Sequence, residues 1–168
     1  MNVSRKFPHS RLRRNRFTSS IRNLVAENNL TVNDLIQPIF IKEGLDGSEV
    51  INSLPGINRY GLNALDSELE RIQNNKINAV AVFPVIDPKK KDDNGTESLN
   101  EDNLVCKAIK QIKNSSDLTV IADVALDPYT SHGHDGLLDE SGYVDNDSSL
   151  ASLTGQAMTL AKAGADMV

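Results

Sequence analysis

The chain has 168 residues, of which 39% are hydrophobic, 4% aromatic and 24% charged, and its formal net charge is -5 at pH 7. This composition is typical of a globular protein and excludes a disordered or fibrous chain. The longest apolar runs are far shorter than the ~20 residues that span a membrane, so we expect no membrane partner. The length suits one domain with a sizeable core.

The N-terminal segment is basic. Residues 1–26 carry seven basic side chains and no acidic one, whereas the remainder carries 11 basic and 23 acidic groups. Such a segment can bind nucleic acid, dock on an acidic neighbouring subunit or stay solvated. Because no recognition motif accompanies it, we expect no nucleic-acid partner. No apolar stretch typical of a secretory signal is visible, and the single cysteine, Cys106, excludes a multi-cysteine zinc cluster and fits a reducing compartment.

Helices and strands alternate along the chain. The spacing of apolar residues predicts, in chain order, a helix over 18–28, a strand over 35–41, a helix over 62–74, a strand over 79–83, a helix over 100–113, a strand over 118–124, a helix over 153–163 and the start of a strand over 166–168. Pro38 is expected to break the first strand and Pro84 to close the second, while Asn100 caps the third helix and Gly164 ends the last.

This alternation of buried strands and helices predicts a parallel α/β fold, in which the carboxyl ends of the strands share one side. That side carries the chemistry in barrels and open sheets alike. No glycine-rich dinucleotide motif or phosphate-binding loop is present. Because an eight-unit barrel takes ~250 residues, the chain is either a small open sheet or the front half of a barrel.

A polar constellation follows the third strand over residues 123–136. Asp123 lies in an apolar strand, where a buried carboxylate needs partners. Asp127 continues the same face if the backbone stays extended, and the glycines at 133 and 136 let the chain fold back to bring Asp135 near Asp127. Paired carboxylates can bind a hard cation or a substrate ammonium group, or share a proton. The alternative is a solvated loop.

His132 and His134 lack a third nitrogen or sulfur ligand, which disfavours a zinc site.

The run D-V-A-L-D-P-Y-T-S-H-G-H-D-G resembles the metal-binding region of the porphobilinogen synthase family, also called delta-aminolevulinic acid dehydratase. The resemblance extends over essentially the whole chain, and its other matching stretches are residues 11–15, 34–40, 54–57, 83–85 and 163–166.

The resemblance implies an α/β fold of the (β/α)₈ TIM-barrel type. Residues 1–30 would form an N-terminal arm and helix, and residues 31–168 the first three to four β/α units of the catalytic domain. It also implies condensation of two 5-aminolevulinate molecules to porphobilinogen with loss of water, in cytoplasmic heme and tetrapyrrole biosynthesis. The arm would embrace a neighbouring subunit in a homo-octamer, which accounts for the basic segment better than nucleic acid does.

Zinc-dependent members of this family have cysteines at the positions of Ala125, Asp127 and Asp135. The chain therefore resembles the aspartate-rich class, which lacks cysteine-ligated zinc and is often stimulated by magnesium. The resemblance implies that Asp123, Asp127 and Asp135 are catalytic, and that Asp127, Asp135 and Ser131 bind substrate. Asp127 and Asp135 would also be the metal ligands. The two histidines belong to the motif without an assigned step.

The family's two Schiff-base lysines lie after a serine–aspartate stretch that would begin just beyond Val168, so we expect none of them in this chain and no activity from it alone. Lys42 is the nearest substitute, since it follows the first strand, but we expect it and the other lysines to be solvated. The alternatives are a truncated, non-catalytic remnant or interaction fragment, and a different metal-dependent barrel lyase with the same carboxylate loop.

Overall fold

The computed structural model describes residues 6–168, which divide into a first unit ending at Thr31 and a second unit spanning Val32–Val168. The first unit contains a short 3-10 helix, Leu12–Arg16, and the helix α1, Ser19–Leu24. The Thr18 hydroxyl accepts a hydrogen bond from the Ile21 N–H at 3.2 Å and caps α1. The helix is shorter than the predicted 18–28 because none of its residues is buried, and a short helix without packing is marginal.

The second unit is built on a five-stranded sheet with the order β2-β3-β1-β4-β5. The strands are β1 Ile36–Lys42, β2 Ser48–Val50, β3 Asn58–Tyr60, β4 Ala79–Val85 and β5 Thr119–Ala122. Strand β1 is parallel to β3 and β4, and β4 is parallel to β5. The predicted parallel α/β architecture is confirmed, but the antiparallel pair β2–β3 lies between the predicted strand over 35–41 and the predicted helix over 62–74, where no strand was predicted. Its three-residue strands are too short to give an alternating pattern.

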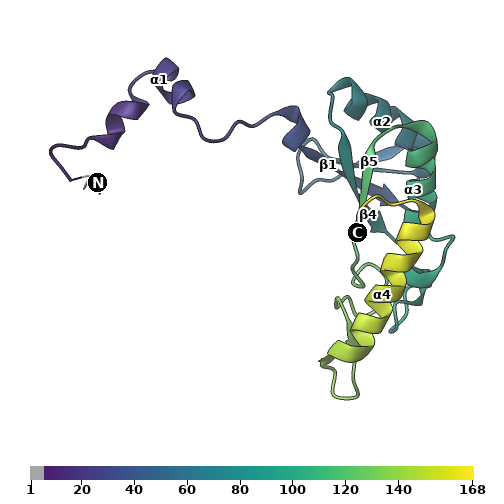
Figure 1. Ribbon diagram of the computed structural model, residues 1–168. Coiled ribbons are helices and arrows are strands. Elements are labelled where there is room, and N and C mark those ends of the chain that lie inside the picture. The colour runs from purple at the N-terminus through teal and green to yellow at the C-terminus, as the bar shows by residue number, and fades with distance from the viewer. Residues whose placement is uncertain (1–5) are drawn as a thin grey trace. The chain divides into compact units, whose positions relative to one another are not determined.

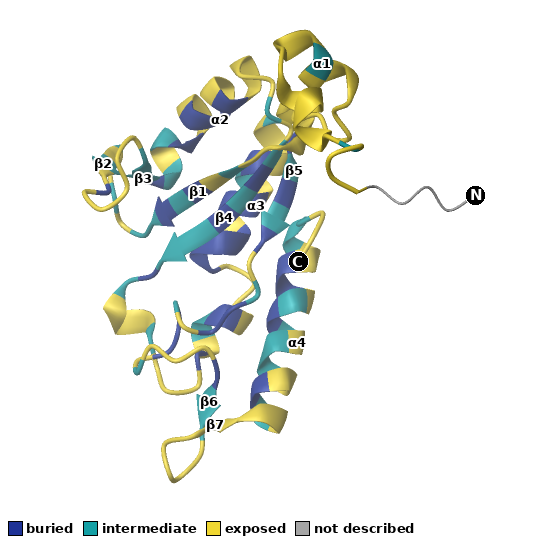
Figure 2. Ribbon diagram, turned by 90° about the vertical axis from the view of Figure 1, so that its left-hand side faces the viewer, coloured by how far each residue is buried: buried dark blue, intermediate teal, exposed yellow. Residues whose placement is uncertain are grey.

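Helices cover one face of this sheet. They are α2 Leu65–Asn74, α3 Leu104–Ser115 and α4 Asn146–Ala163 (Figure 1). Alternate strand residues such as Ile39, Val80 and Val120 are buried in one cluster with α2 and α3, and Figure 2 shows this buried layer in dark blue. On the opposite face Phe40 and Phe83 are half-buried, and their rings stack with centroids 5.5 Å apart.

Two helix starts differ from the predictions. Asn103, not Asn100, caps α3, because its side chain accepts the Cys106 N–H at 2.8 Å. Helix α4 begins at Asn146 rather than at residue 153, since Asp145 accepts the Ser148 N–H at 3.0 Å. The polar loop before α4 contains a small hairpin of β6 Leu137–Leu138 and β7 Val144–Asp145. Gly164 ends α4 with a φ of 108°, as predicted.

Two prolines lie inside strands rather than at their ends. The Glu43 N–H donates to the Val85 carbonyl across β1 and β4. Because hydrogen-bonding groups of successive strand residues point to alternate sides, Pro38 faces away from β4 and Pro84 faces away from β1. At Pro38, β3 does not pair with β1, and at Pro84, β5 does not pair with β4. Neither proline therefore removes a ladder hydrogen bond, which explains why both are tolerated.

The predicted fourth strand begins as a single parallel bridge between Met167 and Ile121. The Ala122 N–H donates to the Met167 carbonyl at 2.9 Å, and the pairing thus continues the sheet beyond β5. Among residues 6–168, no helix combines the length and the apolar character that crossing a membrane requires.

Candidate active site

A cavity of about 370 Å³ lies at the carboxyl end of the sheet, on the face opposite the helices. Asp123 and Asp127 line it together with Phe40, Phe83 and Arg59. Two of the three predicted aspartates therefore share a cavity with an apolar floor and a cationic side chain. This is the side of a parallel sheet on which ligands bind.

The expectation that Asp123 is buried is wrong. Its side chain is exposed in the described chain, whereas the preceding Ala122 is buried against the helices. Since successive residues of a strand point to opposite faces, Asp123 points to the open face. A carboxylate there needs no buried partner, and its chemical interest comes from its neighbours.

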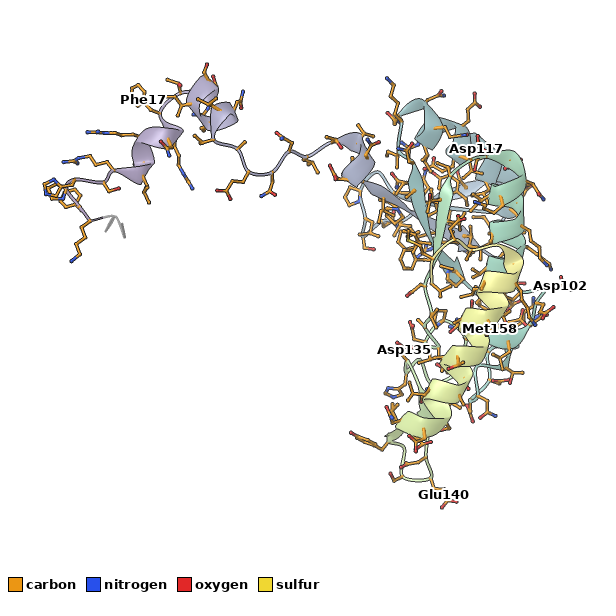
Figure 3. All side chains as sticks on the ribbon, in the orientation of Figure 1. Phe17, Asp102, Asp117, Asp135, Glu140 and Met158 are labelled. Carbon is orange, nitrogen blue, oxygen red and sulfur yellow. The ribbon has the colours of Figure 1, made fainter. Side chains whose placement is uncertain are left out.

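Asp135 folds back onto the strand-end segment, as the sequence predicts. Its Oδ1 accepts a hydrogen bond from the Leu126 N–H at 2.6 Å, although Asp135 does not line the cavity. Gly133 makes the turn with a φ of 74°. Gly136 permits close packing, because a Cβ there would lie 2.5 Å from Cγ1 of Val144. Figure 3 labels Asp135 on the loop beside α4.

The three carboxylates act on one another electrostatically. Partial burial is the largest cause that raises the pKa of Asp127 above its ordinary value, and the negative charges of Asp135 and Asp123 raise it further. Lys91 acts weakly in the opposite direction. A positive group placed among these carboxylates would relieve their repulsion, so the arrangement favours an ammonium group or a metal cation.

The donor set fits magnesium better than zinc. Asp127 and Asp135 offer carboxylate oxygens only, and Mg²⁺ commonly takes one or two carboxylates while it keeps several waters. Within residues 6–168, no group of three or more histidine, cysteine, aspartate or glutamate side chains is arranged to hold a metal.

Ser131 and His132 join the loop to the segment after β4, His134 contacts residues of its own loop, and none of the three lines the cavity. The Ser131 hydroxyl donates to the carboxylate of Asp93, and Nε2 of His132 lies 3.2 Å from the carbonyl oxygen of Asp93. The His134 N–H donates to Nδ1 of His132 at 3.1 Å. Because this nitrogen accepts, the ring proton of neutral His132 sits on Nε2, facing Asp93. These contacts fix the position of the loop.

Sequence reasoning missed Asp93 and Gln156 near the site, and it gave Tyr129, which lies in the constellation over residues 123–136, no role of its own. Tyr129 is buried, and burial raises its pKa, so that the phenol stays neutral. Gln156 is buried in α4 and donates to the Ala125 carbonyl at 2.9 Å. A signal for Gln156 existed, because it lies four residues before Leu160 and helical spacing puts both on one face. No sequence pattern distinguished Asp93, because it lies in a loop that contains several other charged residues.

Lys42 does not have the environment of a nucleophilic lysine. Its Nζ contacts both carboxylate oxygens of Glu49, at 2.8 and 2.9 Å, and Arg59 contacts the same carboxylate at 3.1 Å. These partners lower the pKa of Glu49, chiefly through the hydrogen bond from Lys42. A lysine amine becomes a nucleophile when it is desolvated or lies beside an unpaired cation, whereas the amine of Lys42 is held by the carboxylate of Glu49. Several other lysines that we expected to be solvated also form ion pairs, namely Lys90, Lys110, Lys113 and Lys162.

Known proteins resemble this chain over nearly its whole length. The family model described as delta-aminolevulinic acid dehydratase matches residues 9–168. Dehydratases of this name from Bradyrhizobium diazoefficiens and Chlamydia pneumoniae are 43% and 45% identical, each over 94% of this chain. The alignments cover 45% and 48% of those relatives, so the chain spans about half the length of the curated relatives that it matches.

A solved structure agrees with these sequence matches. The crystal structure of delta-aminolevulinic acid dehydratase (porphobilinogen synthase) from Toxoplasma gondii ME49, in complex with the reaction product porphobilinogen, superposes with a TM-score of 0.88 at 42% identity. The match covers 95% of this chain and 46% of that chain. The chain belongs to the delta-aminolevulinic acid dehydratase family.

Proposed function

We propose that this chain forms the N-terminal half of a porphobilinogen synthase, which condenses two 5-aminolevulinate molecules to porphobilinogen with loss of water in heme and tetrapyrrole biosynthesis. Family membership supports the activity. The acidic cavity at the carboxyl end of the sheet is the observation that carries the proposal for this chain, because it combines carboxylates with an apolar floor. A small substrate with an ammonium group and a carbon chain suits such a cavity.

The fold proposed for the whole protein is a (β/α)₈ barrel, of which this chain supplies an arm (residues 1–30) and the first three to four units (31–168). Two features support it. Strands β1, β4 and β5 are neighbours in the order of the chain, each followed by a helix. Helices α2 and α3 pack on one face of the sheet, as in a barrel wall, whereas an open doubly wound sheet carries helices on both faces.

In this proposal Asp123, Asp127 and Asp135 act on the substrate amine. Their mutual repulsion favours binding of an ammonium group. The raised pKa of Asp127 brings this carboxyl closer to the range in which an acid exchanges protons at neutral pH. Ser131 is proposed to orient the substrate-binding loop through its contact with Asp93.

We also propose magnesium as the metal ion, with Asp127 and Asp135 as its protein ligands. The ion would supply a fixed positive charge beside the carboxylates. The chemistry of the donor set supports this choice, since both groups are hard oxygen donors. Asp135 uses Oδ1 for the Leu126 N–H, which leaves Oδ2 for a cation.

The proposed partners are further copies of the same chain, in a cytoplasmic homo-octamer contacted through the N-terminal arm. The concentration of basic residues in the arm supports this, because the remainder of the chain is acidic. Phe7, Phe17 and Leu24 are exposed in the arm, so the arm offers large apolar side chains that a neighbouring copy could cover.

The test is pyrrole formation from 5-aminolevulinate by the product of the complete reading frame and by residues 1–168 alone. We expect turnover by the first and none by the second, because the residues that form imines with the substrates are proposed to lie outside this chain. Turnover by residues 1–168 would refute the argument about the lysines. No turnover by either protein would favour a non-catalytic remnant.

A further inference from the structure

One peptide group at the site is held from both sides. The Ala125 carbonyl accepts a hydrogen bond from Nε2 of Gln156 at 2.9 Å, and the Leu126 N–H donates to Oδ1 of Asp135 at 2.6 Å. This carbonyl and this N–H belong to the same planar peptide unit. Helix α4 and the acidic loop therefore both hydrogen-bond to the peptide group of Ala125 and Leu126, which lies in the chain between Asp123 and Asp127. We call this pair of hydrogen bonds the clamp.

Gln156 is an unusual residue for this position on α4. It is 1% exposed, and its Oε1 has no hydrogen-bond partner among the described residues. Burying an amide oxygen without a partner costs free energy, which an apolar side chain of the same shape would avoid. Packing alone does not account for glutamine here, whereas its polar contacts do: its Nε2 donates to the Ala125 carbonyl at 2.9 Å, and its side chain also interacts with the phenol of Tyr129.

Helix α4 packs closely against a neighbouring segment next to Gln156. A Cβ on Gly155 would lie 2.9 Å from Cδ2 of Leu99, so α4 comes near the segment before α3 at this point. One turn later Leu160 is fully buried in the core. The helix is thus anchored on both sides of Gln156, and the donor that it presents to the Ala125 carbonyl is held in place.

We propose that Gln156 is a positioning residue of the acidic cavity. By fixing the peptide group of Ala125 and Leu126 it sets the spacing of Asp123 and Asp127, and it orients the N–H that engages one oxygen of Asp135. Asp135 then presents a single free oxygen to a cation or an ammonium group. This inference rests on the proposed synthase function for its catalytic consequence, while the clamp itself is a property of the fold.

The test compares Gln156→Met with Thr159→Val in the protein made from the complete reading frame. Methionine keeps the length of glutamine and removes the donor. Thr159 is a matched control, because it is also a buried polar residue of α4 but donates to the Gly155 carbonyl within its own helix. Hydrogen–deuterium exchange of peptides covering residues 123–136, thermal melting and kcat/KM are measured for both variants.

We expect faster exchange over residues 123–136 in Gln156→Met, with unchanged exchange in β1 and β4, and a fall in kcat/KM of about tenfold or more, since small displacements of catalytic groups have large effects. Thr159→Val should change neither the exchange over residues 123–136 nor kcat/KM. Unchanged exchange in Gln156→Met would overturn the clamp. Faster exchange with an unchanged kcat/KM would overturn the positioning role. A wild-type protein without turnover would refute the proposed function, and the exchange data would then decide the clamp alone.

Discussion

The cap of α3 gives the sharpest quantitative prediction, because sequence and structure name different residues for it. Asn103 is fully buried. Its Oδ1 accepts the Cys106 N–H at 2.8 Å, and its Nδ2 donates to the Glu97 carbonyl at 3.3 Å. Asn100 is exposed; its Oδ1 accepts the Asp102 N–H at 3.0 Å, and its Nδ2 donates to the Glu97 carboxylate at 3.1 Å, where solvent can replace both bonds.

Replacing Asn103 by alanine removes the cap, which costs about 1 kcal/mol. It also leaves the partly buried Glu97 carbonyl without this donor, which costs about 1 kcal/mol more. We therefore expect a loss of about 2 kcal/mol in the free energy of unfolding for Asn103→Ala. Asn103→Asp keeps the acceptor and loses the donor, so its loss should be intermediate, whereas Asn100→Ala should lose about 0.5 kcal/mol or less.

Urea unfolding followed by circular dichroism measures these differences, provided that the slope of the transition is the same in all variants. The informative result is the order in which Asn103→Ala, Asn103→Asp and Asn100→Ala lose free energy of unfolding. If Asn100→Ala lost as much free energy as Asn103→Ala, the helix would begin where the sequence pattern put it, and the assignment of the cap to Asn103 would be wrong.

Three further predictions concern the acidic loop. Asp127→Asn should raise the melting temperature at neutral pH, because a carboxyl whose pKa in the folded protein lies above its ordinary value of 3.8 destabilises the fold once it is ionised. This gain in melting temperature should shrink as the pH falls towards 3.8. A lower melting temperature of the variant at pH 7 would contradict the pKa argument. Gly136→Ala should cost about 1–3 kcal/mol, measured by thermal unfolding, because its Cβ would lie 2.5 Å from Val144; an unchanged stability would mean that the hairpin yields freely. Asp135→Ala should lower kcat/KM sharply in the complete enzyme, and a zinc chelator should have little effect on the activity of the unmodified enzyme. Near-normal kinetics in the variant would mean that the loop carrying Asp135 is only a solvated loop.

The sequence predicts the repeating pattern of the fold better than its boundaries. Apolar periodicity located every strand longer than three residues and the three helices of the second unit. It misplaced the start of α4, because the first turn is fixed by the Asp145 cap and not by apolar residues. It missed β2 and β3, because their stability comes from pairing with each other and from the pairing of β3 with β1, rather than from their own composition.

The candidate site was predictable where the chain itself determines geometry. The glycines at 133 and 136 predicted the return of Asp135. The extended backbone on which a shared strand face of Asp123 and Asp127 depended is not present, because β5 ends at Ala122, although both side chains line the cavity. The burial of Asp123 was wrong, because composition does not tell which face of a strand the helices cover. The contacts of Gln156 and Asp93 depend on segments distant in sequence, and no local pattern records them.

The prolines of the sheet restrict how β1 can be extended. On the side away from β4, the amides of Phe40 and Lys42 can donate, but Pro38 cannot, because its nitrogen carries no hydrogen. A strand that joins β1 along this edge therefore meets a gap in the row of donors two residues before Phe40. The gap makes the amino half of β1, which β3 does not reach, a poor template for an unintended neighbour.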